Sequence, residues 1–282
     1  MGAVSVQDIQ ALRKITGAGI LDVRKALNAS NGDIEKARQW LRVNGLSNMK
    51  LQAKEGGQGV VALADTIKNP TNVAGDSAID GAKVAVLLEL KCDTDFVAKS
   101  DQFVLLSTKM AGDVLLGGTE VLSKYEAEIQ ELQLAVKENI SVGRVVRFDV
   151  PPENELGTYL HIQTGRGING VLVEVQGEDR TRTAELAHDL AVHIAFARPE
   201  YISTEEVPQE ILDAERKTFE EISRREGKPP AVLEKVTDGR IKDWYKEKCL
   251  LAQPWVKDEK QTIQQLLGQA KVLRFAQVEV NV

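Results

Sequence analysis

Two closely spaced carboxylates and an aromatic side chain follow the most apolar run in the sequence. Residues 84–90 read VAVLLEL, and residues 93–97 read DTDFV. An aspartate–x–aspartate pattern after a buried strand is typical of phosphatases that use an aspartate nucleophile and Mg²⁺. In that chemistry Asp93 would attack phosphorus, and Asp95 would serve as the acid or base.

The phosphatase interpretation needs a parallel sheet, with a lysine and an acidic pair at the ends of later strands. After residue 140, however, the expected strands are joined by hairpins instead of crossover helices, which favours antiparallel pairing. So short a motif also matches unrelated sequences by chance. Phosphatase chemistry at Asp93 and Asp95 therefore remains an alternative.

Other possible ligand sites lack the context that they need. GRGING (165–170) has the letters of a dinucleotide fingerprint, but a strand pattern follows it where that fingerprint requires a helix. A hairpin turn that needs glycine explains it better. The three histidines are His161, His188 and His193, and the last two would lie about 140° apart on a helix. We predict no cofactor and no metal site.

Composition limits the class of protein. The chain has 282 residues, 43% of them hydrophobic and 28% charged, which indicates about two compact globular units. Its net charge of −6 makes generic affinity for nucleic acid unexpected. Two cysteines are too few for a disulfide framework. Without an apolar run of about 20 residues or a signal-peptide pattern at the start, we expect a cytoplasmic protein that contacts no membrane.

The N-terminal segment has the pattern of three short helices. Apolar residues recur at helical spacing over residues 5–45, and glycine-containing breaks interrupt them at 16–19 and 28–33. We therefore predict a three-helix domain at residues 1–45. Residues 46–59 are expected to be a linker.

The centre and the C-terminal end mix strand and helix patterns, which predicts an α+β fold with antiparallel sheets. One core subdomain is expected over residues 60–150, with strands at 60–64, 82–90 and 144–150 and helices at 96–116 and 123–137. A second is expected over 151–204 and 268–282, with strands at 158–164, 171–176 and 272–280 and a helix at 183–197.

Between the two parts of the second subdomain, residues 205–244 are helical in pattern and rich in charge. EGKPP (226–230) interrupts them, and each half has a narrow apolar stripe. This pattern predicts an antiparallel coiled-coil hairpin, inserted with its return segment at residues 205–267. A charge-rich face of this kind is usually only solvated.

Five motifs in order resemble the bacterial elongation factor Ts family. They are residues 12–37 (LRKITGAGILDVRKALNASNGDIEKA), 94–99 (TDFVAK), 157–175 (GTYLHIQTGRGINGVLVEV), 190–202 (LAVHIAFARPEYI) and 250–267 (LLAQPWVKDEKQTIQQLL). The resemblance implies a guanine-nucleotide exchange factor for elongation factor Tu, and not an enzyme. It also implies that the N-terminal domain is of the ubiquitin-associated type. Some members continue into a C-terminal helical module, whereas this sequence stops at Val282.

The resemblance assigns the DTDF segment to partner binding. It implies that Asp95 and Phe96 enter the GTPase domain near the loops that hold Mg²⁺ and the nucleotide phosphates. Thr94, Val97 and Lys99 would support or flank them. We call Asp95 and Phe96 the exchange wedge.

The residue pattern leaves other roles open for the exchange wedge. At 100° per residue, Phe96 falls on the same helical stripe as Phe103, Met110 and Val114, which predicts burial. A position in the first turn would let it project instead. Asp95 could also be the N-cap of that helix.

Two further contact regions follow from the resemblance. Leu12, Ile20 and Leu21 would form an apolar patch against the GTPase domain, although internal packing is an alternative for Leu12. A second surface would meet the partner's distal β domain, and its residues are His161, Gly165, Arg166 and Gly167. A scaffold that binds a partner without promoting exchange remains a further alternative.

Overall fold

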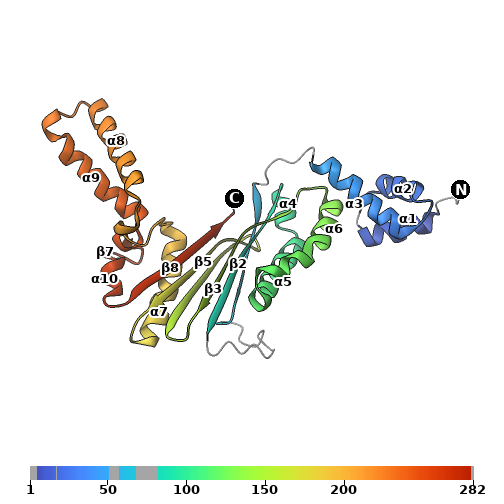
Figure 1. Ribbon diagram of the computed structural model, residues 1–282, viewed down its shortest axis with the longest axis horizontal. Helices are drawn as coiled ribbons and strands as arrows, with labels where there is room; N and C mark the ends of the chain where they lie inside the picture. The colour runs from blue at the N-terminus through green and yellow to red at the C-terminus, as the bar shows by residue number, and fades with distance from the viewer. Residues whose placement is uncertain (1–4, 17, 51–56, 68–81, 281–282) are drawn as a thin grey trace.

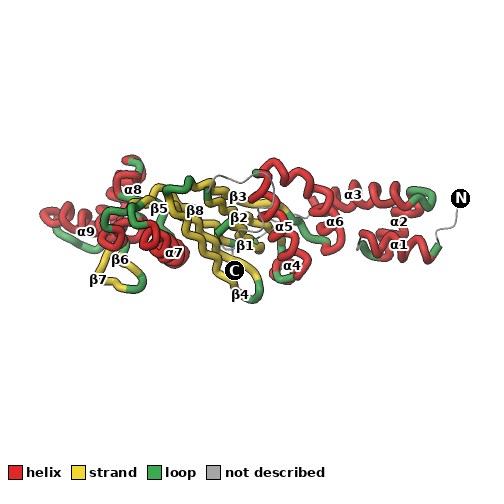
Figure 2. Tube along the Cα trace, turned by 90° about the horizontal axis from the view of Figure 1, so that it is seen from below, coloured by secondary structure: helices red, strands yellow, loops and turns green. Residues whose placement is uncertain are grey.

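The computed structural model of the protein describes residues 5–16, 18–50, 57–67 and 82–280. Two antiparallel sheets lie at the centre of an elongated molecule (Figures 1 and 2). A group of N-terminal helices lies at one end of the long axis, and a helical hairpin lies at the other (Figure 1). Mixed helix with antiparallel sheet confirms the predicted α+β class.

Three helices form the N-terminal group: α1 (Val6–Thr16), α2 (Ile20–Ala29) and α3 (Ile34–Lys50). The break between α2 and α3 uses positive φ angles at Asn31 (52°) and Gly32 (86°), a conformation that glycine and asparagine tolerate best. Helix α3 continues into the predicted linker 46–59 as far as Lys50, so the linker prediction is wrong for residues 46–50. Residues 51–56 of that linker lie outside the described residues.

The first sheet consists of β1 (Gln58–Asp65), β2 (Lys83–Cys92) and β3 (Ser141–Val150), in the order β1-β2-β3. Strand β2 is central and buried on both faces, which explains its continuous apolar run. Four helical elements pack on one face: α4 (Asp95–Ala98), α5 (Asp101–Gly117), a 3₁₀ helix (Thr119–Tyr125) and α6 (Glu126–Val136).

The second sheet consists of β4 (Asn154–Gln163), β5 (Arg166–Gln176) and β8 (Lys271–Glu279), in the order β4-β5-β8. Its outer face is covered by α7 (Arg180–Ala197) and α10 (Ile263–Leu267). Its inner face packs on the first sheet, where Leu87 and Phe148 share one apolar cluster with Leu172 and Val278. The core thus has four layers, with a helical layer outside each sheet.

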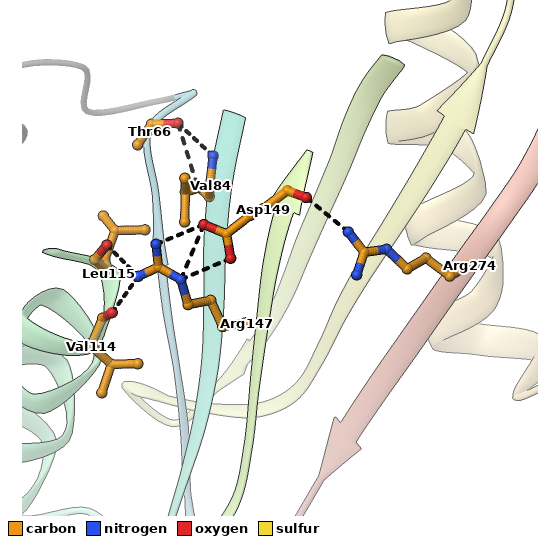
Figure 3. A network of polar contacts seen from close by, with 7 residues as sticks. All are labelled: Thr66, Val84, Val114, Leu115, Arg147, Asp149 and Arg274. Carbon is orange, nitrogen blue, oxygen red and sulfur yellow. Dashed lines mark hydrogen bonds and ion pairs between the residues drawn. The ribbon is translucent and has the colours of Figure 1, made fainter. Parts of the chain in front are cut away.

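Polar contacts join these layers at one edge (Figure 3). The Arg147 guanidinium donates to the carbonyl oxygens of Val114 and Leu115, both at 2.6 Å, and so satisfies the end of α5. It also pairs with the Asp149 carboxylate at 2.7 Å. Arg274, from the second sheet, donates to the backbone oxygen of Asp149 at 2.9 Å. Helix, first sheet and second sheet are therefore connected at this edge.

The helical hairpin consists of α8 (Gln209–Arg225) and α9 (Pro230–Lys248), which run antiparallel away from the sheets (Figure 1). A 3₁₀ turn (Thr204–Glu206) precedes it, and a cluster that includes Tyr201, Trp244 and Cys249 packs at its base. The return segment contains a 3₁₀ turn (Leu250–Ala252), β6 (Pro254–Trp255) and β7 (Asp258–Thr262).

The coiled-coil character of the hairpin, the ubiquitin-associated type of the N-terminal helices and the domain boundaries stay predictions. In the described part of the chain, no helix has the length and apolar character that crossing a membrane requires.

Candidate functional site

A helix of four residues, α4, carries the predicted exchange wedge at the end of the central strand β2. Thr94 is its N-cap, because the Thr94 hydroxyl accepts a hydrogen bond from the Val97 N–H at 3.4 Å. Val97 and Ala98 are buried and anchor the helix on the core. The side chain of Phe96 is 85% exposed. The helix therefore packs by one side and presents Phe96 on the other.

The burial of Phe96 that the helical stripe indicated is wrong. The predicted helix 96–116 is broken, since α4 ends at Ala98 and α5 begins at Asp101. Ser100 caps the new helix by accepting a hydrogen bond from the Phe103 N–H at 3.4 Å. Counting 100° per residue is not valid across such a break. Phe103 is buried while Phe96 is not.

The predicted N-cap role of Asp95 is also wrong, because Thr94 occupies that position. Asp95 is the first residue of α4, and its carboxylate receives the Lys99 ammonium at 2.7 Å, one helical turn later. This hydrogen bond lowers the pKa of Asp95 below its ordinary value of 3.8. Asp95 therefore carries its full negative charge at neutral pH.

The turn before α4 is held by a distant part of the chain. The Glu138 carboxylate accepts hydrogen bonds from the backbone N–H groups of Asp93 (3.2 Å) and Thr94 (3.0 Å) and from the Thr94 hydroxyl (2.5 Å). The Asn139 N–H donates to Asp93 Oδ2 at 2.9 Å. Sequence reasoning missed Glu138, since no local pattern connects it with a turn 44 residues away.

Asp93 itself is placed to support the turn and not to attack a substrate. It is half-buried, and one carboxylate oxygen accepts the Asn139 N–H. The other oxygen, Oδ1, is buried without a hydrogen-bond partner among the described residues. The sheet behind it is antiparallel, unlike the parallel sheet that the phosphatase interpretation requires. That alternative is therefore abandoned.

A buried thiol lies directly under this turn. Cys92, the last residue of β2, is fully buried and donates its thiol to the Thr94 carbonyl oxygen at 3.2 Å. Burial raises the pKa of this thiol to about 12, so it stays neutral.

In the N-terminal helices, only part of the predicted patch is at the surface. Ile20 is 53% exposed and Leu21 is 72% exposed, both at the start of α2. Leu12 is fully buried in a cluster with Val23 and Leu27. Its predicted contact with a partner is therefore wrong, because a core residue of α1 cannot reach another protein.

Only some of the residues predicted to form a surface on the second sheet are exposed. His161 and Gly165 are exposed at the turn between β4 and β5. Positive φ angles at Thr164 (50°) and Gly165 (80°) form this turn, which confirms the hairpin interpretation of GRGING.

The other two histidines lie on α7. His188 is exposed there, whereas His193 is buried and lies 2.9 Å from Gln253. In the described part of the chain, no group of three or more His, Cys, Asp or Glu could hold a metal ion.

Arg166 and Gly167 are buried, so their prediction as surface contacts is wrong. The Arg166 guanidinium donates to the Gly59 carbonyl oxygen at 2.6 Å and to Gln58 Oε1 at 3.0 Å, which connects β5 with β1. A side chain at Gly167 would meet the Val61 carbonyl oxygen at 2.2 Å. Close packing of the two sheets requires this burial, and the glycine-rich letters do not reveal it.

Comparison with known proteins agrees with this arrangement of elements. The family described as Elongation factor TS matches residues 93–282. The chain is 34% identical to Elongation factor Ts of Aquifex aeolicus, over 99% of this chain and 98% of that protein. It is 36% identical to Elongation factor Ts of Renibacterium salmoninarum, over 100% of both chains. Elongation factor Ts of Saccharopolyspora erythraea is also 36% identical, over 100% of this chain and 99% of its own.

These findings define a bacterial translation elongation factor and not an enzyme. The chain belongs to the elongation factor Ts family. Membership in this family implies partnership with elongation factor Tu.

Proposed function

We propose that this chain promotes GDP release from elongation factor Tu by inserting Asp95 and Phe96 near the Mg²⁺ and phosphate site. One observation carries the proposal: Phe96 is 85% exposed although it belongs to an anchored helix. Burial of an aromatic ring of this size in a partner contributes a large share of binding free energy. Its backbone is already ordered, so insertion costs little further conformational entropy.

The proposed chemistry is displacement without bond cleavage. GDP affinity in such GTPases depends on Mg²⁺ and on the backbone donors around the phosphates. A ring that shifts these groups weakens nucleotide binding. The Asp95 carboxylate adds a negative charge that repels phosphate and attracts Mg²⁺, and its hydrogen bond with Lys99 holds that carboxylate in place. Lys99, Thr94 and Val97 thus act as supporting residues.

Binding of GDP and binding of this factor to elongation factor Tu must weaken each other equally. If the factor lowers the affinity of elongation factor Tu for GDP, then GDP must lower the affinity for the factor by the same ratio. The ternary complex is therefore transient, and either GDP or GTP can enter after release. Exchange follows the nucleotide concentrations and needs no cofactor.

Additional contacts would hold the partner while the wedge acts. Ile20 and Leu21 provide an exposed apolar pair for the GTPase domain, and His161 with Gly165 provides a polar turn for the distal β domain. The net charge of −6 favours contacts with protein over direct contacts with nucleic acid. We expect the activity in the cytoplasm, where bacterial translation occurs, without membrane contact.

A stopped-flow measurement tests the proposal. Elongation factor Tu loaded with fluorescent GDP is mixed with excess unlabelled GDP, with and without this protein, at fixed Mg²⁺. We expect the rate of fluorescence loss to rise with the concentration of the protein and to reach a plateau. Binding without faster release would support the scaffold alternative and overturn the exchange proposal.

A further inference from the structure

We propose that Glu138 is a positioning residue for nucleotide exchange, because its carboxylate holds the turn from which Asp95 and Phe96 project. This inference rests on the proposed function of the exchange wedge. It assigns a role to a residue that lies outside the DTDFV motif, in the loop between α6 and β3.

The contacts of Glu138 are directed at one turn. One carboxylate oxygen accepts the two successive N–H groups of Asp93 and Thr94, and the other accepts the Thr94 hydroxyl. Two consecutive donors on one oxygen fix the orientation of both peptide planes. Hydrogen bonds to a carboxylate are roughly twice as strong as neutral ones. Glu138 therefore sets the direction in which α4 leaves β2.

The hydroxyl contact extends this control to the helix itself. Thr94 Oγ1 donates its proton to Glu138 and accepts the Val97 N–H. Because the proton goes to Glu138, the lone pairs of the hydroxyl remain free for the capping contact. Phe96 lies in the turn of helix that this cap orders.

The end of α6 places Glu138 beside the turn that precedes α4. Lys137 adopts a left-handed conformation (φ 61°) and its N–H returns to the Gln133 carbonyl oxygen at 2.8 Å, so the helix stops there. Glu138 and Asn139 then run beside the turn, and the Asn139 N–H donates to Asp93 Oδ2. Contacts in both directions thus join this segment to the turn.

The N-terminal helices rest on the same helix, α6. Leu134 is buried in the N-terminal apolar cluster, Glu131 pairs with Arg38, and Lys137 pairs with Asp22 at 3.4 Å. The exposed pair Ile20 and Leu21 directly precedes Asp22. A partner bound at Ile20 and Leu21 would therefore contact helices that pack against α6, and the loop after α6 holds the turn at Asp93 and Thr94.

The test compares Glu138→Ala, Glu138→Gln and a matched control, Glu128→Ala. Glu128 lies in the first turn of α6 and pairs with Lys109 at 3.0 Å, away from the wedge. With elongation factor Tu carrying fluorescent GDP, we expect Glu138→Ala to lower the plateau release rate about tenfold, the equivalent of one lost charge-assisted hydrogen bond. The concentration for half-maximal rate should change less than twofold, because the binding surfaces remain. Glu128→Ala should match the parent.

Glutamine keeps one acceptor for the backbone N–H groups and an amide that can donate to Thr94. We therefore expect the Glu138→Gln plateau rate to lie between those of the parent and Glu138→Ala, about threefold below the parent, with an unchanged melting temperature. If Glu138→Ala does not fold, this threefold difference still tests the proposal. A folded Glu138→Ala protein with the parent's plateau rate would overturn the proposal, as would a Glu138→Gln protein at the parent's rate where only that variant folds.

A double-mutant cycle with Phe96→Ala separates the two levels of inference. If Glu138 acts through the wedge, then adding Glu138→Ala to Phe96→Ala should slow release by less than twofold more. Fully multiplicative effects would overturn the positioning role and leave the wedge intact. An unaffected Phe96→Ala protein would instead overturn the proposed function itself.

Discussion

Truncating Phe96 should impair exchange while leaving the fold almost unchanged. Phe96 is 85% exposed, so only about 15% of the residue's surface is covered. For an aromatic surface of roughly 200 Å², that is about 30 Å², which is worth at most about 1 kcal/mol of folding free energy. Alanine is also the better helix former, which offsets part of this loss. We expect the free energy of unfolding of Phe96→Ala to lie within about 0.5 kcal/mol of that of the parent.

Phe103 is the matched control, because it is the same residue type seven positions later and fully buried. Phe103→Ala should cost about 3–5 kcal/mol of stability. Thermal denaturation followed by circular dichroism separates the two, since each kcal/mol lowers the melting temperature by about 2–4 °C in a chain of this size.

The exchange assay should rank the two variants in the opposite order, with Phe96→Ala the more impaired. At a temperature where all three proteins are folded, Phe96→Ala should release GDP from elongation factor Tu at least about tenfold more slowly than the parent, the equivalent of one lost hot-spot contact. Phe103→Ala should retain more activity. The reasoning is refuted if Phe96→Ala melts as early as Phe103→Ala, or if it exchanges GDP as fast as the parent.

Three more changes test other parts of the structure. Thr94→Ala should destabilise α4 by about 1 kcal/mol while Thr94→Ser should not, and urea denaturation of both would show whether the cap matters. Arg147→Met should cost about 2 kcal/mol, because the end of α5 loses its donors, whereas the exposed control Arg225→Met should stay within about 0.5 kcal/mol in the same assay. Burial lowers the pKa of His193 below 6.5, so the unfolded chain binds the proton more tightly, and stability should fall as the pH drops below about 6.5. Urea midpoints measured from pH 8 to pH 5 should fall less for folded His193→Asn than for the parent, and equal slopes would exclude this histidine as the cause.

The local pattern predicted most elements, because hydrophobic periodicity and turn residues act over a few neighbours. The run at 84–90 lies in the central strand β2, and GRGING supplies Gly165 of a hairpin turn and the start of β5. The pattern failed where the same local sequence is compatible with either one continuous helix or two successive helices. Ser100 begins a new helix instead of continuing the old one, and this one break turns Phe96 from the core to solvent.

Burial at the candidate site could not be predicted in the same way. Leu12 and Ile20 are both aliphatic residues at helical spacing, yet one is enclosed by three helices and the other is at the surface. The family resemblance implied that Arg166 lies on a partner-binding surface, and arginine is seldom buried. Its guanidinium is instead enclosed where β5 meets β1, with the Gly59 carbonyl oxygen as an acceptor.

The sequence by itself determined the α+β class and the order of most elements, since these depend on residue types and spacing. Its resemblance to the elongation factor Ts family implied which segment carries the proposed wedge. Tertiary structure alone decided that Glu138 holds the turn at Asp93 and Thr94, and that α6 packs against the N-terminal helices while the loop after it contacts this turn. The physical reason is that such contacts join segments far apart in the chain. They form only after the layers have packed, and no spacing within the sequence encodes which distant carboxylate will meet which backbone N–H.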